Sequence, residues 1–156
     1  MTARTGVLLA LLVVAGCGGG TESGGSVGGA AASGAVAAGS ELSAEQLAKG
    51  IGPITSVTLG EVDAALAEQG KATFTLKCSA CHKLEARYVA PQLGGVLERR
   101  TPEFVMNMIL NPAEMTARHP ETKKLLAEYL LAMPDQNLTE AEARAVLEYI
   151  RSWKQP

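Results

Sequence analysis

The sequence predicts an all-α domain that is preceded by a long segment without a fold of its own. In the stretch 61–77, apolar or small residues recur at every fourth position, which is helical spacing. Two later segments begin with threonine followed by proline or by an acidic turn, and both patterns are typical of helix starts. Within the domain we find no convincing alternation of apolar and polar residues, so no strand is expected. About four to five helices are expected.

Residues 1–16 resemble an export signal. Arg4 gives a short positive region, Val7 to Ala15 form an unbroken apolar run, and small residues precede Cys17. The run has about half the length that a bilayer span requires, so it is not expected to be a transmembrane helix. Val14-Ala15-Gly16-Cys17 resembles the lipobox of bacterial lipoproteins, in which the cysteine is lipidated. A conventional signal peptide with an incidental cysteine is the alternative.

Residues 17–40 are expected to be a flexible linker behind the lipidated cysteine. They consist mostly of Gly, Ala and Ser, and Glu22 is the one charge. Such a composition cannot bury enough apolar surface to offset the entropy of ordering, and its root-mean-square reach is roughly 25 to 30 Å. Residues 41–60 form a pre-domain extension with a short helix capped by Ser43. This extension could wrap the domain or lengthen the tether.

Cys78-Ser79-Ala80-Cys81-His82 is the motif that carries chemistry. This pattern is the attachment site of a c-type haem, in which both thiols bond to the porphyrin and the histidine ligates the iron. A redox-active cysteine pair would be expected near a strand–helix–strand pattern, and none flanks it. A structural zinc site needs four ligands, and beyond these three only Cys17 and His119 remain as cysteine or histidine. We therefore expect one covalently attached haem c.

The domain, residues 61–156, follows in order from these signals. Helix 61–77 is expected to pack through one face, with Gly70 allowing another helix to approach closely. Residues 83–100 are expected to form a loop, interrupted by Pro91 and Gly94-Gly95. The apolar face of helix 61–77 contains Val62, Leu66, Gly70 and Phe74.

Three more helices complete the prediction. Thr101 and Pro102 begin one that ends at Asn111-Pro112, a second spans about 120–131, and a capping box at 139–142 begins the last. The segment between the first two is expected to be a connection. The inward-facing residues are expected to be Phe104, Val105, Met108 and Ile109, then Leu125, Leu126, Tyr129 and Leu130, and finally Val146, Tyr149, Ile150 and Trp153.

Over roughly residues 61–154 the chain resembles the monohaem class I cytochromes c. Four separate features carry the resemblance: the first helix, the pentapeptide at Cys78, a Met133-Pro134 loop and the aromatic last helix. The resemblance implies the cytochrome c fold, with the first and last helices crossing at Gly70. It also implies that His82 is the proximal ligand and that the carbonyl of Pro91 accepts a hydrogen bond from its ring.

The sixth iron ligand is the more open question. Met106 and Met108 lie within a helix and are more often core residues. Met115 lies in the expected connection, as does His119, which is most simply a solvated turn residue before Pro120. Met133 lies fifty-one residues beyond His82, before a loop that leads into the last helix. The resemblance places the axial methionine there, so Met133 is the preferred ligand.

These ligands predict an electron carrier and not an enzyme, because two strong axial ligands leave no open site on the iron. We expect an exported, membrane-anchored monomer that faces the periplasm or the cell exterior. Its redox partners would be a quinol-oxidising complex and a terminal oxidase or reductase. A haem-binding sensor and a subunit of a multi-subunit oxidoreductase are the alternatives. The net charge of −2 argues against nucleic acid as a partner. Lys77, Lys83 and Arg87 form either a basic docking rim or an ordinary solvated face.

Overall fold

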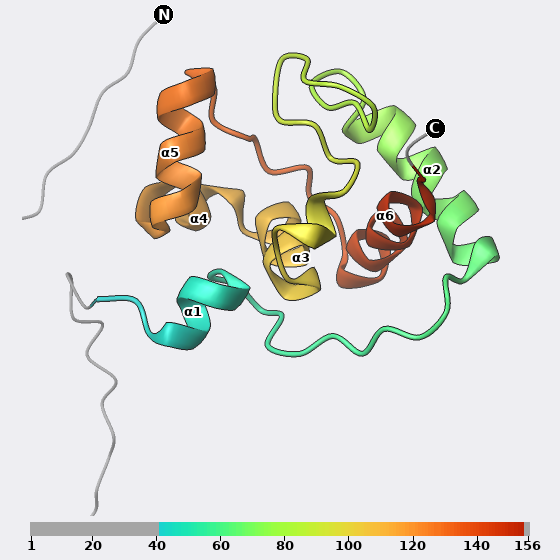
Figure 1. The fold of residues 1–156 in the computed structure, drawn as a ribbon, viewed down its shortest axis with the longest axis horizontal. Helices are drawn as coiled ribbons and strands as arrows, with labels where there is room; N and C mark the ends of the chain where they lie inside the picture. The colour runs from blue at the N-terminus through green and yellow to red at the C-terminus, as the bar shows by residue number, and fades with distance from the viewer. Residues whose placement is uncertain (1–40, 155–156) are drawn as a thin grey trace, which may run out of the picture. The chain divides into compact units, whose positions relative to one another are not determined.

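The computed structural model describes residues 41–154, and this part of the chain contains six α-helices, one short 3₁₀ helix and no strand (Figure 1). None of these helices is both long and apolar enough to cross a membrane. The predicted export signal, Cys17 and the predicted linker lie outside the described residues. The elements are α1 (Ala44–Lys49), α2 (Ala64–Lys77), η1 (Val96–Glu98), α3 (Pro102–Leu110), α4 (Pro112–Arg118), α5 (Pro120–Tyr129) and α6 (Glu140–Ser152).

Helices α2 and α6 cross at Gly70, as expected. A Cβ atom at this position would lie 1.9 Å from the carbonyl oxygen of Ala145, so only glycine permits the contact. One turn further on, the rings of Phe74 and Tyr149 pack with their centroids 5.3 Å apart. Helix α2 starts three residues later than predicted, because the side chain of Asp63 accepts a hydrogen bond from the N–H of Leu66 and caps the helix there.

The predicted starts of two other helices are confirmed. Thr101 caps α3, with Pro102 in its first turn, and Thr139 forms a capping box with Glu142 at the start of α6. The 3₁₀ helix η1 interrupts the expected loop 83–100 after Gly95, whose φ is 70°. The main core lies between α2, α3 and α6, and its buried members include Val105, Met106, Val146 and Ile150.

The segment after Asn111 is a helix and not the expected connection. Proline disfavours helical geometry in the residue before it but suits the first position of a helix, so Pro112 ends α3 and begins α4 at once. Met115 in α4 is fully buried, and so is His119 at the start of α5. The prediction of a solvated His119 is therefore wrong. Its ring packs edge-on against Phe104 at 5.1 Å, and its Nε2 lies 3.2 Å from the carbonyl oxygen of Leu47.

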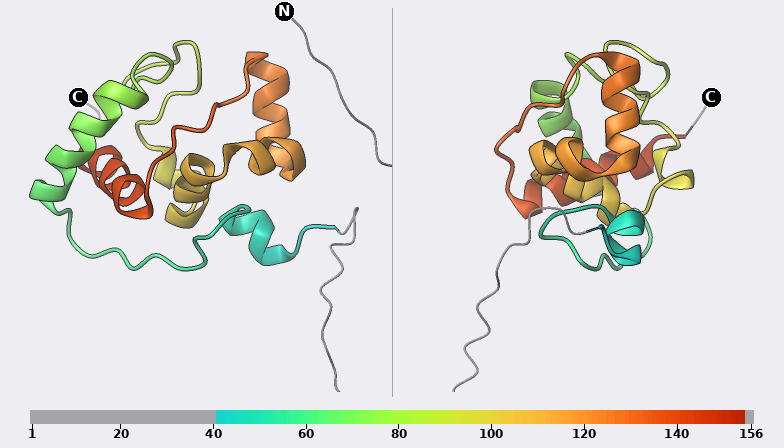
Figure 2. Two further views of the ribbon diagram at one scale, coloured as in Figure 1. Left: turned by 180° about the vertical axis from the view of Figure 1, so that it is seen from behind. Right: turned by 90° about the vertical axis from the view of Figure 1, so that its left-hand side faces the viewer.

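Residues 41–60, here called the strap, pack against the domain. Figures 1 and 2 show the strap running past α3 and α6 to the start of α2. Ile51 and Ile54 are buried. The side-chain amide of Asn107 both donates hydrogen bonds to the strap backbone and accepts one from it. Its Nδ2 donates to the carbonyls of Lys49 (3.0 Å) and Ile54 (2.9 Å), and its Oδ1 accepts from the N–H of Ile54 (2.9 Å). Of the two alternatives, the wrapping extension is the observed one.

The end of the strap is held by charged side chains. The buried carboxylate of Glu148 pairs with Arg144 and Arg151, at 2.7 and 2.6 Å. These two arginines donate onward to the carbonyls of Thr58 (3.2 Å) and Gly60 (2.7 Å). The carboxylate thus has partners that offset the cost of its burial, and the same arginines fix the strap to α6.

Of the four residues expected to face inward from α5, Leu130 does not. Leu130 follows the helix in a left-handed conformation, with φ 53°, and 86 % of its surface is exposed. Leu125, Leu126 and Tyr129 instead line a cavity. Helix α5 therefore has an apolar side that no other helix of the described chain covers fully.

Candidate functional site

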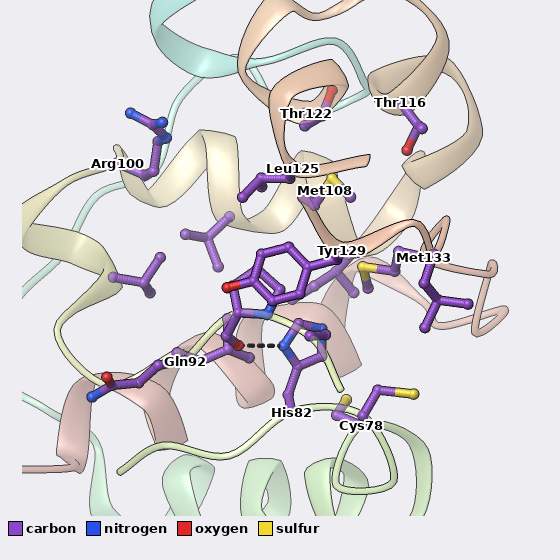
Figure 3. Close-up of a pocket in the computed structure, with 18 of the residues that line it drawn as sticks. Cys78, His82, Gln92, Arg100, Met108, Thr116, Thr122, Leu125, Tyr129 and Met133 are labelled. Atoms are coloured by element: carbon purple, nitrogen blue, oxygen red, sulfur yellow. Dashed lines mark hydrogen bonds between the residues drawn. The ribbon is translucent and has the colours of Figure 1, made fainter. Parts of the chain in front are cut away.

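A cavity of about 490 Å³ lies between α3, α5, α6 and the segment that follows α2. Its volume falls in the range of roughly 300 to 1,000 Å³ that is usual for cofactor sites. Figure 3 shows side chains converging on it, including His82 from the segment after α2, Tyr129 from α5 and Met133 from the segment between α5 and α6. Most of the wall is apolar, with Leu93, Val96, Ile109, Leu125, Val146 and Ile150 among its members. Such a wall suits a large flat apolar ring such as a porphyrin.

The end of α2 brings the three motif side chains to one side of this cavity. Cys78 caps the helix, and its N–H donates to the carbonyl of Phe74 at 2.9 Å. The N–H groups of Cys81 and His82 both donate to the carbonyl of Cys78, at 3.1 and 2.9 Å. This tight turn places both sulfurs and the imidazole on the cavity wall, as attachment of a single porphyrin requires.

His82 is oriented through its second ring nitrogen. Its Nδ1 lies 2.8 Å from the carbonyl oxygen of Pro91, which can only accept, so Nδ1 carries the hydrogen and Nε2 is left for iron. Burial lowers the pKa of His82, although the Pro91 carbonyl opposes this shift. The imidazole is therefore held in the neutral form that binds metals. This is the contact that the family resemblance implies for Pro91.

The loop that carries Pro91 is fixed by backbone hydrogen bonds to the motif segment. The N–H of Ala90 donates to the carbonyl of Cys81, and that of Gly94 donates to the carbonyl of Leu84, both at 3.0 Å. A Cβ at Gly94 would lie 2.2 Å from the Leu84 oxygen and 2.3 Å from the ring of Trp153. Glycine here lets the loop pass between the motif segment and the end of α6.

The surroundings of the two cysteines disfavour the other interpretations of the motif, which are a redox-active cysteine pair and a structural zinc site. Burial, with a smaller contribution from neighbouring Cys81, raises the pKa of Cys78 to about 11. Redox-active cysteines instead have a lowered pKa, because the thiolate is the reacting form. Among residues 41–154, no cluster of three or more His, Cys, Asp or Glu side chains could hold a metal ion. The described residues thus offer no structural zinc site.

The structure divides the candidate sixth ligands into those that line the cavity and those that do not. Met133 and Met108 line the cavity, and Figure 3 shows the side chain of Met133 pointing into it. Met106 is in the main core. Met115 and His119 are buried against the strap, where the sulfur of Met115 accepts a hydrogen bond from the N–H of Ile51 at 3.0 Å. Neither of them lines the cavity.

Two cavity arginines were not recognised in the sequence. Arg99 and Arg100 supply positive charge at the wall, so they could pair with the carboxylates of a haem. Arg100 also binds Glu121 at 2.5 Å and lies 5.3 Å above the ring of Phe104. Arg87, in the loop after the motif, and Tyr129, at the end of α5, also line the cavity. The one available sequence signal was the adjacent pair of arginines directly before Thr101, the cap of α3.

Comparison with known proteins agrees with this geometry. Residues 67–154 match the sequence model of the cytochrome c family. No curated protein matches the chain. The cytochrome c from Rhodothermus marinus is 50 % identical, with a TM-score of 0.65, and the match covers 69 % of this chain and 93 % of that one. An engineered cytochrome c from the same organism is 49 % identical, with a TM-score of 0.65 and coverage of 69 % and 94 %.

A second structure of the engineered protein, bound to a carbene intermediate, is 49 % identical with a TM-score of 0.62, and the match covers 69 % of this chain and 94 % of that one. The cytochrome c family binds one covalently attached haem c and transfers electrons, and the Cys78–His82 motif fits that attachment. The chain therefore belongs to the cytochrome c family and is a haem-containing electron carrier of the monohaem class I type.

Proposed function

We propose that this protein carries single electrons between components of a respiratory chain, with a closed iron centre ligated by His82 and Met133. The observation that carries the proposal is that both side chains line one cavity, from segments on either side of it. The bound haem would supply the reversible one-electron change of its iron. The protein would hold two strong ligands in place and exclude other molecules from the iron.

The ligand pair determines which redox state is favoured. A thioether is neutral and soft, so it stabilises ferrous iron and raises the potential relative to histidine ligation. The Pro91 carbonyl makes the His82 ring a stronger donor and keeps its orientation fixed. With both axial positions filled, the iron is expected to transfer electrons and not to bind a substrate.

Optical spectra of the purified holoprotein in both redox states test the ligand assignment. Wild type should show the far-red methionine-to-iron band in the ferric state, and Met133→Ala should lose it. Met108→Leu is the decisive control, because Met108 is the other methionine that lines the cavity. Loss of the band in Met108→Leu, with retention in Met133→Ala, would reverse the assignment.

We further propose that the protein is exported and anchored through lipid on Cys17, facing the periplasm or the cell exterior. The support is the sequence pattern Val14-Ala15-Gly16-Cys17 and the Gly/Ala/Ser-rich residues that follow. Mass spectrometry of the mature amino terminus tests this. A lipidated Cys17 that moves the protein to the membrane fraction, and a soluble Cys17→Ser variant, are the expected results. An unmodified cysteine would contradict the anchor.

Redox proteins remain the proposed partners: a quinol-oxidising complex as donor, and a terminal oxidase or reductase as acceptor. Two of the three residues suggested for a basic docking rim are engaged within the protein. Lys83 donates to the carbonyl of Ser79 at 3.0 Å and lies 5.1 Å from the centre of the Tyr88 ring. Arg87 is paired with Glu128.

The ion pair of Arg87 weakens the basic rim as a steering device, because a paired charge projects less field than a free one, whereas Lys83 keeps its full charge. We therefore expect electron transfer to a native partner to slow only modestly between low and physiological salt. A steep fall of the rate with ionic strength would instead favour the basic rim.

A further inference from the structure

Arg87 joins two segments that lie on opposite sides of the haem cavity. Its Nη1 lies 2.6 Å from Oε1 of Glu128, and its Cζ lies 4.2 Å from the centre of the Tyr129 ring. Glu128 and Tyr129 are the last two residues of α5, whereas Arg87 belongs to the loop that follows the motif. One guanidinium thus forms an ion pair and a cation–π contact with adjacent residues of another segment.

Each of these segments leads to one proposed axial ligand. The loop of Arg87 continues to Pro91, whose carbonyl binds His82. The end of α5 continues through Leu130 to Met133, which lines the cavity. The chain reverses at Leu130, where φ is 53°, a conformation that is unfavourable for a leucine.

In the part of the chain that the structure describes, few hydrogen bonds hold the segment that carries Met133, although Met133 and Leu138 pack against the main core. The hydrogen bonds seen between residues 131 and 138 are local. Gln136 donates to the carbonyl of Pro134 at 3.1 Å, and the N–H of Asn137 donates to the side chain of Asp135 at 2.8 Å. Contacts at the end of α5 are therefore well placed to control how readily the Met133 segment moves.

We propose that Arg87 is a positioning residue that holds the end of α5 against the motif loop and thereby keeps Met133 on the iron. We call the contact of Arg87 with Glu128 and Tyr129 the latch. The proposal rests on the proposed ligation by Met133. The latch does not touch the iron. It slows the opening step in which the methionine leaves the iron and an external ligand can enter.

The kinetics of imidazole binding to the ferric holoprotein test the latch. At high imidazole concentration, the rate at which the far-red band disappears approaches the rate at which Met133 leaves the iron. The ion pair is half exposed and the stacked guanidinium lies near the surface, so each contact contributes modestly. We expect Arg87→Gln to raise the limiting rate about fivefold, within a range of roughly three- to tenfold.

Three further variants make the result specific. Glu128→Gln removes the ion pair and keeps the stack, and Arg87→Lys keeps the charge and loses the planar stack, so both should give intermediate rates. Arg118→Gln is the matched control, because it breaks the exposed pair of Arg118 with Glu114, and neither residue lines the cavity. Its limiting rate should equal that of wild type.

The possible failures can be told apart. If wild type shows no far-red band, or if Met133→Ala retains it, ligation by Met133 is wrong and the latch proposal fails too. If the band depends on Met133 but Arg87→Gln and Glu128→Gln bind imidazole at the wild-type rate, the latch alone is wrong. Should Arg87→Gln fail to assemble, Glu128→Gln decides the question by itself, because its side chain does not line the cavity.

Discussion

At the scale of single residues, the sulfur of Met115 serves the fold and not the iron. It accepts the N–H of Ile51 at 3.0 Å in a fully buried position. Met115→Leu keeps the volume but leaves that N–H without a partner, so the free energy of unfolding should fall by about 2 kcal/mol. Denaturant titration of the holoprotein measures the loss, and the far-red band should be unchanged. A variant that lost the band would show that Met115 reaches the iron.

The same scale shows which site residues can be predicted from sequence. Cys78, Cys81 and His82 are recognisable because the attachment chemistry fixes their spacing within one turn of chain. Arg87 and Tyr129 are separated by more than forty residues, and their contact depends on how α5 is placed. Met115 and His119 were placed in a connection, and His119 was interpreted as solvated, because the strap that covers them lies more than sixty residues away in sequence.

At the scale of elements, the crossing of α2 and α6 leaves no room for a side chain at Gly70. The Cβ of Gly70→Ala would lie 1.9 Å from the Ala145 carbonyl oxygen, so the helices must separate. We expect a loss of about 3 kcal/mol or more in the free energy of unfolding. Gly60→Ala is the control, since a Cβ there would meet nothing within 4 Å. Equal stability of the two variants in denaturant unfolding would contradict the close crossing.

The capping box of α6 predicts a pH dependence. The backbone N–H and the hydroxyl of Thr139 both donate to Glu142 at 2.8 Å, and the backbone bond is the main reason why the pKa of Glu142 lies below its ordinary value of 4.5. A lowered pKa in the folded state stabilises the protein fully above 4.5, and this contribution is lost as pH falls through the lower folded value. In Glu142→Gln, the melting temperature should therefore fall less steeply as the pH is lowered through this range. An unchanged decline would show that other carboxylates account for it.

Helices were predictable where a capping residue and an apolar stripe coincide. Thr101 and Thr139 each begin a helix that the sequence located to within one residue. Pro112 was interpreted only as a stop, although proline equally suits the first turn of α4. The stripe of α5 was correctly identified as apolar, but much of it faces the cavity. Sequence periodicity identifies an apolar face without saying whether protein or a cofactor will cover it.

At the scale of the whole molecule, the strap joins parts of the chain that no local pattern relates. Arg144 and Arg151 reach the carbonyls of Thr58 and Gly60 across more than eighty residues of sequence. Such contacts depend on the complete fold, and they leave no regular spacing of apolar residues in the sequence of residues 41–60. Within the described residues, the folded unit therefore includes the strap as well as the domain predicted from residue 61 onward.

Asn107 is the residue on which the first half of this wrapping depends. It is fully buried and makes three hydrogen bonds, of 2.9 to 3.0 Å, to the strap backbone. Asn107→Ala leaves the N–H of Ile54 unpaired and opens a small void, so we expect a loss of about 3 kcal/mol. Gln46→Ala, in the exposed capping box of α1, is the control and should cost clearly less.

Hydrogen exchange of the holoprotein distinguishes local release of the strap from general weakening. In Asn107→Ala, the amides of Ile51 and Ile54 should exchange faster by a larger factor than those in the core of α6, because the strap can open while α2 and α6 stay packed. The far-red band should persist, since Asn107 does not line the cavity. An equal increase at Ile54 and Val146 would mean that the strap unfolds only together with the haem-binding core, as one cooperative unit.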